Sequence, residues 1–283
     1  MIMQTYVMTE NMIGEYRQHL REEERASGTI EKYMRDVRRF TAWLNGRCVT
    51  KEATSEWKEY LVALNYCPTT INSMLASVHG FFRFAGWENC RTKFLRIQRR
   101  IFREQKKELG KSDYKKLITT AKNKKQDRLA MIIETIGATG IRVSELKYLT
   151  VEAVGQGQVV VSMKGKIRTI LLPGKLVEKL LAYAKKKKIK TGEIFVTRNG
   201  TSVSRKQIWA EMKRLCKAAG VATTKVFPHN LRHLFARIFY KSSKDIVRLA
   251  DVLGHSSIET TRIYLVTSGL EYQTWLDQLR LVI

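Results

Sequence analysis

The sequence predicts a mainly α-helical protein with one small β-hairpin, in which an all-α N-terminal domain is joined by a basic linker to an α+β C-terminal domain. Three observations support this fold class. Apolar residues recur at alternating steps of three and four through residues 1–95, which is the spacing of one helical face. Two short β-branched segments, 159–163 and 167–172, flank a glycine-containing turn and indicate a hairpin. Residues 96–111 are dense in basic side chains and have little apolar periodicity, as expected of a linker.

The N-terminal domain is expected to hold four helices, bounded by residues that start or break helices. Gly28 precedes the second helix, and Asn45-Gly46 ends it. Pro68 opens the fourth helix, and Gly86 stops it. The expected helices are residues 9–25, 30–44, 51–65 and 68–85.

One face of the fourth expected helix carries small polar groups and an arginine, opposite the apolar stripe. These side chains are Thr70, Asn72, Ser73 and Arg83. Such groups can contact DNA phosphates. A solvated helix face explains the same spacing equally well, so both interpretations stay open.

The C-terminal region is expected to surround the hairpin with helices, with Ser112 as the N-cap of the first. The expected helices are residues 112–125, 127–137, 142–149, 174–190, 204–219, 228–241, 244–253 and 256–264. A last amphipathic stretch, 268–281, has no obvious place to pack. Its apolar residues are Leu270, Trp275, Leu276 and Leu279. They could pack within this chain or against another copy.

The charge balance points to a polyanionic partner. Lys and Arg number 52 against 26 acidic residues, for a net charge of +26. Such an excess repels itself unless nucleic acid or an anionic membrane is a regular partner. Residues 1–95 carry 13 basic and 11 acidic side chains, whereas residues 96–283 carry 39 and 15. The second region is therefore expected to present the more electropositive surface to nucleic acid.

Other features argue against a membrane, a metal site and secretion. No stretch reaches the roughly 18 apolar residues needed to span a bilayer, and no amphipathic anchor with a Trp or Phe edge is evident. The N-terminus shows no signal peptide. Cys48, Cys67, Cys90 and Cys216 form no CxxC pair, so they are expected to be reduced thiols in the cytoplasm.

Three segments of the C-terminal region concentrate reactive side chains: 138–145, 228–233 and 253–255, the last followed nine positions later by a tyrosine. With a lysine from the hairpin they supply two guanidiniums, an ammonium, two imidazoles and a phenol. The six residues are Arg142, Arg232, Lys164, His229, His255 and Tyr264. This set is chemically complete for phosphoryl transfer and requires neither metal nor cofactor.

Each residue type suits one need of phosphodiester cleavage. Arginines stabilise charge on the phosphate oxygens through paired donors, and histidines can donate to the phosphate or move protons. Lys164, at the hairpin tip, can protonate the departing 5′ oxygen. A phenol with a pKa of about 10 is a weak nucleophile, but cationic neighbours lower its pKa and help it ionise. Tyr264 is therefore the candidate nucleophile.

The same segments resemble the motifs of the tyrosine recombinases, also called the phage integrase family, and in particular the short two-domain Xer-type and mobile-element members. The family's TGxRxSE box is matched by residues 139–145, and its hairpin lysine by Lys164. HxLRH is matched by residues 229–233, and LGH with a tyrosine nine positions later by His255 and Tyr264. Four motifs occur in the family's order and spacing.

The resemblance implies a helical, SAM-like DNA-binding domain at 1–95, the linker at 96–111 and a catalytic domain at 112–283. It implies a 3′-phosphotyrosine intermediate, and strand exchange through a four-way junction without ATP. The expected substrate is duplex DNA with inverted-repeat core sites, bound by dimers that form a tetramer. By resemblance, the C-terminal helix at about 268–283 docks on a neighbouring protomer. This chemistry could serve integration, excision, inversion or dimer resolution. The expected location is the cytoplasm, in association with the nucleoid. The sequence does not identify accessory proteins.

Several residues carry secondary hypotheses. Glu145 is expected to orient catalytic side chains, although an i,i+3 surface pair with Arg142 has the same spacing. His233 is expected to support the helix that carries His229. The two histidines also resemble half of a zinc site, but Arg232 between them would repel a cation. DNA contacts are expected from Lys166 and Arg168 on the hairpin, and from Arg99, Arg100, Arg205 and Lys206.

Two rival functions remain at this point. A type IB topoisomerase-like enzyme uses similar residues but relaxes supercoils as a monomer without sequence preference. A sequence-specific DNA-binding regulator could keep the scaffold without catalysis. The complete catalytic set disfavours the regulator, because binding alone does not require a tyrosine at this spacing.

Overall fold

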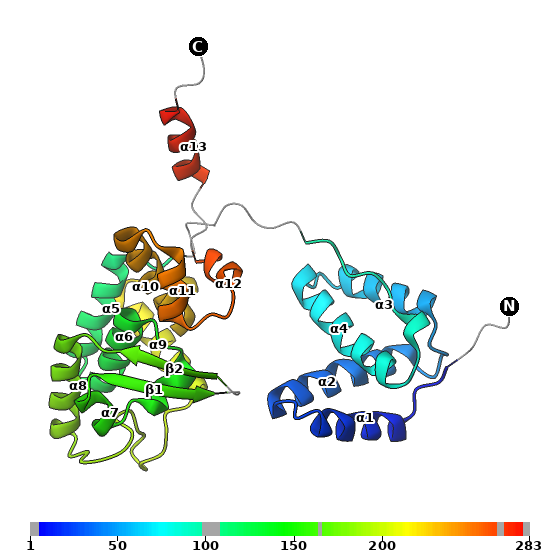
Figure 1. Cartoon of the computed structure of the whole chain (residues 1–283), viewed down its shortest axis with the longest axis horizontal. Helices are drawn as coiled ribbons and strands as arrows, with labels where there is room; N and C mark the ends of the chain where they lie inside the picture. Colours follow the sequence, from blue (N-terminus) through cyan, green and yellow to red (C-terminus); the bar gives the residue numbers. More distant parts are fainter. Residues whose placement is uncertain (1–5, 98–107, 164–165, 265–268, 280–283) are drawn as a thin grey trace. The chain divides into compact units, whose positions relative to one another are not determined.

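The computed structural model describes residues 6–97, 108–163, 166–264 and 269–279. Contacts between Cα atoms divide the chain into two compact units, Met1–Arg99 and Arg100–Ile283. The division falls inside the expected linker. In agreement with the predicted fold class, the described residues are mostly helical and form one small antiparallel sheet (Figure 1).

The N-terminal unit consists of four α-helices followed by a short 3₁₀ helix. They are α1 (Glu10–Glu22), α2 (Ser27–Leu44), α3 (Lys51–Ala63), α4 (Pro68–Phe84) and η1 (Glu88–Cys90). The hydroxyls of Thr9 and Thr50 cap α1 and α3, and α4 begins with Pro68, where a missing N–H costs nothing. The predicted apolar stripes form one core, which includes Phe40, Trp57 and Phe82.

The C-terminal unit combines helices with the two-stranded sheet. Its elements are α5 (Lys111–Asn123), α6 (Asp127–Thr139), η3 (Val143–Tyr148), α7 (Val151–Gly155), β1 (Gln158–Met163), β2 (Lys166–Leu171), α8 (Gly174–Lys186), α9 (Arg205–Ala219), η4 (Thr223–Lys225), α10 (Pro228–Ser243), α11 (Ile246–Leu253), α12 (Ile258–Arg262) and α13 (Gly269–Gln278). None of the helices in the described ranges is both long and apolar enough to cross a bilayer.

Two local predictions for this unit were wrong. The α-helix expected at 142–149 is instead a 3₁₀ helix, Val143–Tyr148, at whose start the Glu145 carboxylate accepts from the backbone N–H of Arg142. Ser112 does not cap α5. The helix begins one residue earlier, with Gly110 as N-cap and the Asp113 carboxylate accepting from its N–H at 3.4 Å. The short helix α7 was not predicted.

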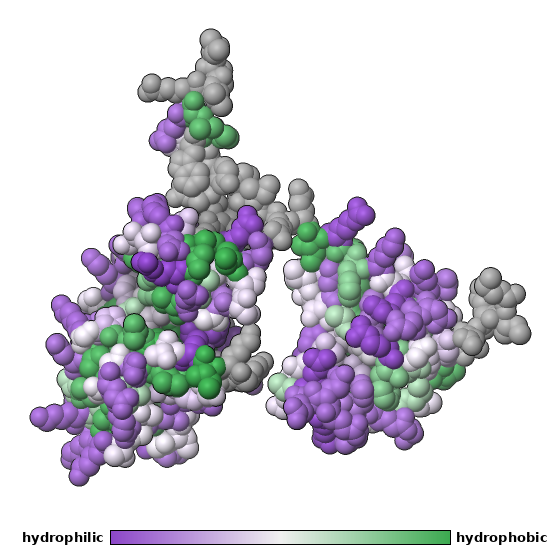
Figure 2. Space-filling view, in the orientation of Figure 1, coloured by the Kyte–Doolittle hydropathy of each residue, from purple (hydrophilic) through white to green (hydrophobic). Residues whose placement is uncertain are grey.

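The predicted hairpin is present, with β1 and β2 antiparallel and Gln158 opposite Leu171; β2 begins one residue earlier than expected, with Lys166 opposite Met163. Alternate residues such as Val159 and Ile170 point into the core. The outward face exposes Val160, Ile167 and Leu171. Figure 2 shows this face as apolar surface over the strands.

Helix packing brings the chemistry-bearing segments together. α10 packs against α6 and α11, and α11 packs against α12. The end of α6, the first turns of α10 and the end of α11 therefore meet, and the three motifs sit at these points.

Candidate active site

The Thr139-Gly140 pair ends α6 and turns the chain toward the site. Thr139 Oγ1 donates to the Thr135 carbonyl at 2.7 Å and accepts from Ile141 N at 3.2 Å. Gly140 has φ +64°, and a Cβ there would lie 2.5 Å from the Phe235 ring. Only glycine combines this conformation with so close an approach. The sharp turn presents the next polar side chain, Arg142, at the edge of the domain.

Glu145 is buried and holds Arg142 at two points. Its carboxylate accepts from Arg142 N at 2.8 Å and from Arg142 Nη1 at 3.0 Å, and also from Arg168 Nη2. Burial alone would raise the pKa of Glu145, but the hydrogen bonds and charges of Arg168 and Arg142 outweigh it and hold the pKa below its usual value. Glu145 therefore stays ionised and fixes the direction of the Arg142 side chain.

Arg232 is almost completely buried near the start of α10. Its guanidinium donates to the Gly140 carbonyl, to the Leu253 carbonyl at 2.7 Å, and from Nη2 to His255 Nε2 at 3.0 Å. Burial, followed by the nearby charge of Arg142, lowers the pKa of Arg232 to about 10. The group remains a cation at neutral pH, in surroundings that disfavour its charge.

The end of α11 provides the acceptors that position both arginines. Gly254 caps this helix at φ +63°, and its carbonyl accepts from Arg142 Nη2 at 3.4 Å. The preceding carbonyl, Leu253 O, accepts from Arg232. A Cβ at Gly254 would lie 2.3 Å from the Arg168 side chain, so this position also requires glycine. One turn of backbone thus holds the two guanidiniums next to each other.

Tyr264 lies among three histidines of its own chain. Its ring centroid is 4.3 Å from that of His233, 5.5 Å from that of His255 and 5.7 Å from that of His229. The side chain is only 2% exposed, and its phenol oxygen supports the charge of Arg232 through a hydrogen bond. The structure thus brings together five of the six side chains predicted to carry the chemistry.

His255 is held between Arg232 and α12. Its Nδ1 lies 2.8 Å from Thr261 Oγ1, on the edge of the ring opposite to Nε2. Burial, and then the charges of Arg232, Arg142 and Arg168, lower the pKa of His255 to about 4. The ring is therefore neutral at physiological pH.

A pocket of about 870 Å³ opens at this cluster. Its lining includes Arg142, His229 and Arg232 together with Arg205, Lys206 and Trp209 from the start of α9. Arg205 and Lys206, predicted as DNA contacts, therefore share a surface with the candidate catalytic groups. Sequence reasoning missed Trp209, which is half-exposed and has Lys213 Nζ 5.3 Å from its ring centroid. An aromatic residue interleaved with basic residues at helical spacing was the available signal.

Arg168 occupies a different position from the one predicted for it. Only 14% of its side chain is exposed, and the guanidinium donates to Glu145 and, at 3.1 Å, to the Val252 carbonyl. A group held this way ties the hairpin to η3 and α11 instead of facing a DNA backbone. The predicted catalytic residue Lys164 and the predicted DNA contacts Arg99 and Arg100 lie outside the described residues, as does the side chain of Lys166, the first residue of β2.

The N-terminal unit has its own basic hollow, of about 390 Å³, between α2 and α4. Thr70 and Ser73 line it, together with Arg35 and Arg39 of α2, which the sequence analysis did not single out. Both arginines are exposed, and a basic residue recurring on the polar side of an amphipathic helix was the missed signal.

The other two predicted contacts on α4 differ in their availability. Arg83 is exposed. The Asn72 amide is already engaged, donating to the Leu95 carbonyl at 2.9 Å and accepting from Leu95 N at 2.8 Å. These two hydrogen bonds hold the segment after η1 against α4.

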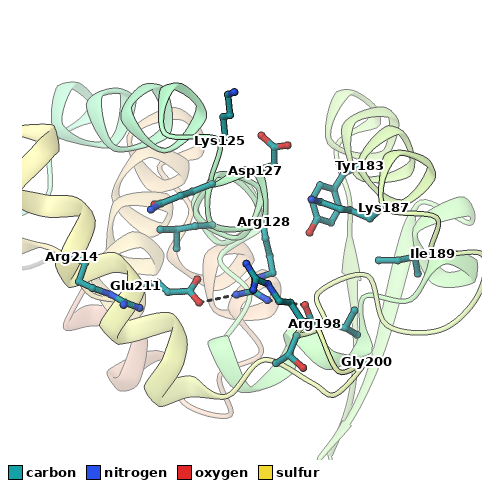
Figure 3. Close-up of a pocket in the computed structure, with 14 residues that line it drawn as sticks. Lys125, Asp127, Arg128, Tyr183, Lys187, Ile189, Arg198, Gly200, Glu211 and Arg214 are labelled. Carbon is teal, nitrogen blue, oxygen red and sulfur yellow. Dashed lines mark hydrogen bonds and ion pairs between the residues drawn. The ribbon is translucent and has the colours of Figure 1, made fainter.

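Another pocket of the C-terminal unit, of about 740 Å³, lies between the start of α6, the end of α8, the segment 196–200 and the middle of α9 (Figure 3). Arg128 and Glu211 point toward each other there at 2.7 Å, and Arg128 also donates to the Val196 carbonyl at 2.8 Å. The pocket contains none of the residues singled out for chemistry, and its central ion pair is satisfied within the fold.

Within the described ranges, no group of three or more His, Cys, Asp and Glu side chains is arranged to hold a metal ion. His229 and His233 are close, with ring centroids 4.6 Å apart, but they face the Tyr264 ring.

Comparison with known proteins gives the family and the fold. The sequence pattern of the phage integrase family matches residues 107–268, and that of the phage integrase N-terminal SAM-like domain matches residues 13–89. Tyrosine recombinase XerA of Pyrococcus furiosus is 29% identical over 93% of this chain and 91% of its own. Tyrosine recombinase XerD of Vibrio cholerae is 25% identical over 84% and 85%.

Solved structures show the same fold. A lambda integrase dimer bound to a COC' core site superimposes with a TM-score of 0.74 at 18% identity, over 92% of this chain and 77% of that one. XerH bound to its difH substrate in a pre-cleavage complex gives 0.69 at 18% identity, over 94% and 84%. Since the catalytic-domain pattern alone spans more than half of the 283 residues, the chain belongs to the phage integrase family of tyrosine recombinases, a class of DNA strand transferases.

Proposed function

We propose that this protein is a site-specific recombinase that cuts and rejoins duplex DNA through a covalent bond between Tyr264 and a 3′ phosphate. The observation that carries the proposal is the gathering of Arg142, Arg232 and Tyr264 around one turn of backbone within a single chain. Fixed guanidiniums beside a phenol supply charge stabilisation and a nucleophile at the same point.

The cleavage step balances without an external reagent. The Tyr264 oxygen attacks phosphorus, the bond to the 5′ oxygen breaks, and that oxygen leaves as a 5′ hydroxyl. The phenolic proton passes to an imidazole, a role that we assign to His229, one of the three histidines whose rings surround that of Tyr264. Lys164 is assigned the donation of a proton to the leaving oxygen. Rejoining is the reverse attack by a 5′ hydroxyl, so one ester replaces another and no ATP is consumed.

The stabilising roles are assigned from the contacts. Arg142 is 39% exposed on its side chain and reaches the pocket, where it can donate to a phosphate oxygen. Arg232 carries a buried Nε that has no hydrogen-bond partner among the described residues. A bound phosphate would supply an acceptor for a donor that burial otherwise leaves unsatisfied.

The assembly is inferred to be a tetramer on two inverted-repeat core sites, with exchange through a four-way junction. Leu276 and Leu279 near the end of α13 are 61% and 58% exposed. Apolar side chains exposed on an amphipathic helix suit docking on a neighbouring protomer. Exposed basic groups on both units, such as Arg35, Arg39 and Lys206, are assigned to DNA. Action on chromosomal or mobile-element DNA would place the enzyme in the cytoplasm, at the nucleoid.

A nicked suicide duplex tests the chemistry. Flanking genomic sequence serves as the candidate core site. A nick just 3′ of the cleavage point makes the released fragment, which bears the 5′ hydroxyl, short enough to diffuse away. Rejoining is then prevented and the covalent adduct accumulates. We expect a covalent complex attached to the 3′ end of the cut strand. Tyr264→Phe should form none while binding the same duplex with nearly unchanged affinity, because only one hydroxyl is removed.

Tyr240, on α10, provides the matched control: Tyr240→Phe removes a hydroxyl from a partly buried tyrosine outside the pocket lining and should react normally. A 3′ adduct formed by Tyr264→Phe would contradict the assignment of the nucleophile. Relaxation of supercoiled DNA by a monomer, without preference for sequence, would instead support topoisomerase-like strand passage.

A further inference from the structure

Both ring nitrogens of His255 lie within hydrogen-bonding distance of another side chain, and only one of these partners is already assigned to the reaction. Its Nε2 lies 3.0 Å from Arg232 Nη2, and its Nδ1 lies 2.8 Å from Thr261 Oγ1. Thr261 belongs to none of the catalytic motifs. It is 0% exposed, which is unusual for a threonine in a five-residue surface helix.

The contact with Arg232 determines which ring nitrogen carries the proton. A guanidinium has donors and no acceptor, so Nε2 must offer its lone pair. A neutral imidazole has one N–H, which must then lie on Nδ1. Nδ1 therefore donates to Thr261 Oγ1, and the hydroxyl is the acceptor that stabilises this tautomer.

Thr261 also reaches the nucleophile through its main chain. Its carbonyl accepts from Tyr264 N at 3.0 Å, in the turn that follows α12. The side chain of one residue is thus fixed to His255, while its backbone is fixed to Tyr264. Any rotation of the His255 ring away from Thr261 uncouples the loop at the end of α11 from the turn that carries the phenol.

We propose that Thr261 is a positioning residue for strand cleavage: its hydroxyl accepts the Nδ1 proton of His255, which directs the Nε2 lone pair toward Arg232 and holds the Tyr264 turn in register with the two arginines. This role rests on the proposed function of the site. Without the hydroxyl, the Nδ1 proton would be buried without an acceptor, and the ring would change tautomer or rotate. A proton on Nε2 would then face the donors of Arg232 and displace the guanidinium.

The test compares two substitutions at this position with one at its neighbour. Thr261→Val keeps the shape and removes the hydroxyl, whereas Thr261→Ser keeps the hydroxyl. Thr260→Val makes the same chemical change at an exposed residue of the same helix. Each full-length protein is assayed for the rate of covalent complex formation on the suicide duplex at saturating DNA, for DNA affinity, and for thermal unfolding.

We expect Thr261→Val to slow covalent complex formation by about tenfold, the scale of one lost orienting hydrogen bond, with unchanged DNA affinity. Thr261→Ser should restore the rate to within about twofold, and Thr260→Val should match the unsubstituted protein. A Thr261→Val protein that cleaves at the normal rate would overturn the proposal, as would a Thr261→Ser protein as slow as the valine variant.

A spectroscopic measurement on the unsubstituted protein covers the case in which Thr261→Val fails to fold. Nitrogen-15 NMR of labelled histidines distinguishes the two neutral tautomers, and a His255→Asn protein identifies the His255 signals. We expect Nδ1 to be protonated and Nε2 not, in the absence of DNA. The reverse tautomer would contradict the role of Thr261 even if recombination is observed. Absence of any covalent adduct in the unsubstituted protein would instead contradict the proposed function, and the tautomer result would still stand.

Discussion

Each unit has an ionic cluster around one buried carboxylate, and the two clusters differ in how their charge is balanced. In the N-terminal unit, the buried Asp36 carboxylate meets Lys32 at 2.8 Å and Arg35 at 3.2 Å. Lys32 also donates to the Ser73 carbonyl and to Ser77 Oγ, both at 2.7 Å, so all three of its N–H groups are used. This cluster is internally satisfied.

In the C-terminal unit, three guanidiniums converge while one carboxylate serves two of them. Glu145 pairs with Arg142 and Arg168, whereas the partners of Arg232 in the described part of the chain are carbonyls, an imidazole and a phenol. A buried cation without a counter-charge is costly to a fold. Among the described residues, the second cluster therefore carries more positive than negative charge, and the difference between the clusters indicates that it suits an anion such as phosphate.

Replacing the uncompensated cation should have the largest effect on cleavage. Arg232→Ala should cut the rate of covalent complex formation by about 10²–10³-fold, the loss seen when one charge-stabilising donor is removed. The measurement is single-turnover cleavage of the suicide duplex at saturating DNA. Thermal unfolding is measured alongside, because the substitution leaves the buried Gly140 and Leu253 carbonyls without this donor and should also lower stability.

The N-terminal cluster gives the matched control for that prediction. Lys32→Ala removes a satisfied cation and should leave the cleavage rate of fully bound complexes unchanged. Equal losses of cleavage rate in Lys32→Ala and Arg232→Ala would contradict this contrast, because they would show that both clusters contribute equally to cleavage.

Arg168 tests whether the second cluster faces inward or toward DNA. Arg168→Gln leaves Glu145 with a single guanidinium partner and should slow cleavage by about tenfold, the scale of a lost charged hydrogen bond. DNA affinity measured against salt should keep the slope of the unsubstituted protein, because the buried group neutralises no phosphate. Arg205→Gln, at the pocket rim, should instead reduce the slope by about one.

If Arg168→Gln reduces the slope of DNA affinity against salt concentration, Arg168 contacts DNA as the sequence predicted. The same slope as the unsubstituted protein, with slower cleavage, would show that the hairpin acts on the site through Glu145.

Arg168 also shows where sequence reasoning stops. Helices and the hairpin follow from short-range periodicity and could be predicted, and the candidate catalytic segments stand out by their reactive residue types and by their resemblance to a known family. A basic side chain on an exposed-looking strand gives no sign that a carboxylate from η3 and a carbonyl from α11 will enclose it. That contact spans 84 residues between Arg168 and Val252, and nothing local encodes it.

The same limit applies to Thr261 and Asn72. Thr261 reads as one of two adjacent threonines in a short helix, and only its burial separates it from Thr260. Asn72 reads as a polar group on an open face, yet the backbone of Leu95 occupies its amide. Sequence patterns point to candidate reactive residues, whereas the contacts that such side chains make with the rest of the fold are set by the tertiary structure.

The smallest effect on chemistry is expected from the satisfied cluster itself. Asp36→Asn removes the one carboxylate that Lys32 and Arg35 share, and leaves Lys32 partly buried without a counter-charge. Unfolding of the N-terminal unit by urea should become easier by about 1.5–3 kcal/mol, the value of hydrogen bonds to a charged group. Single-turnover cleavage by the folded, DNA-saturated protein should stay within about twofold of normal, because this cluster stabilises structure and contacts no reacting atom. Easier unfolding combined with cleavage slowed as much as in Arg232→Ala would show that the N-terminal cluster also serves the chemistry, since loss of fold alone would be reversed by saturating DNA.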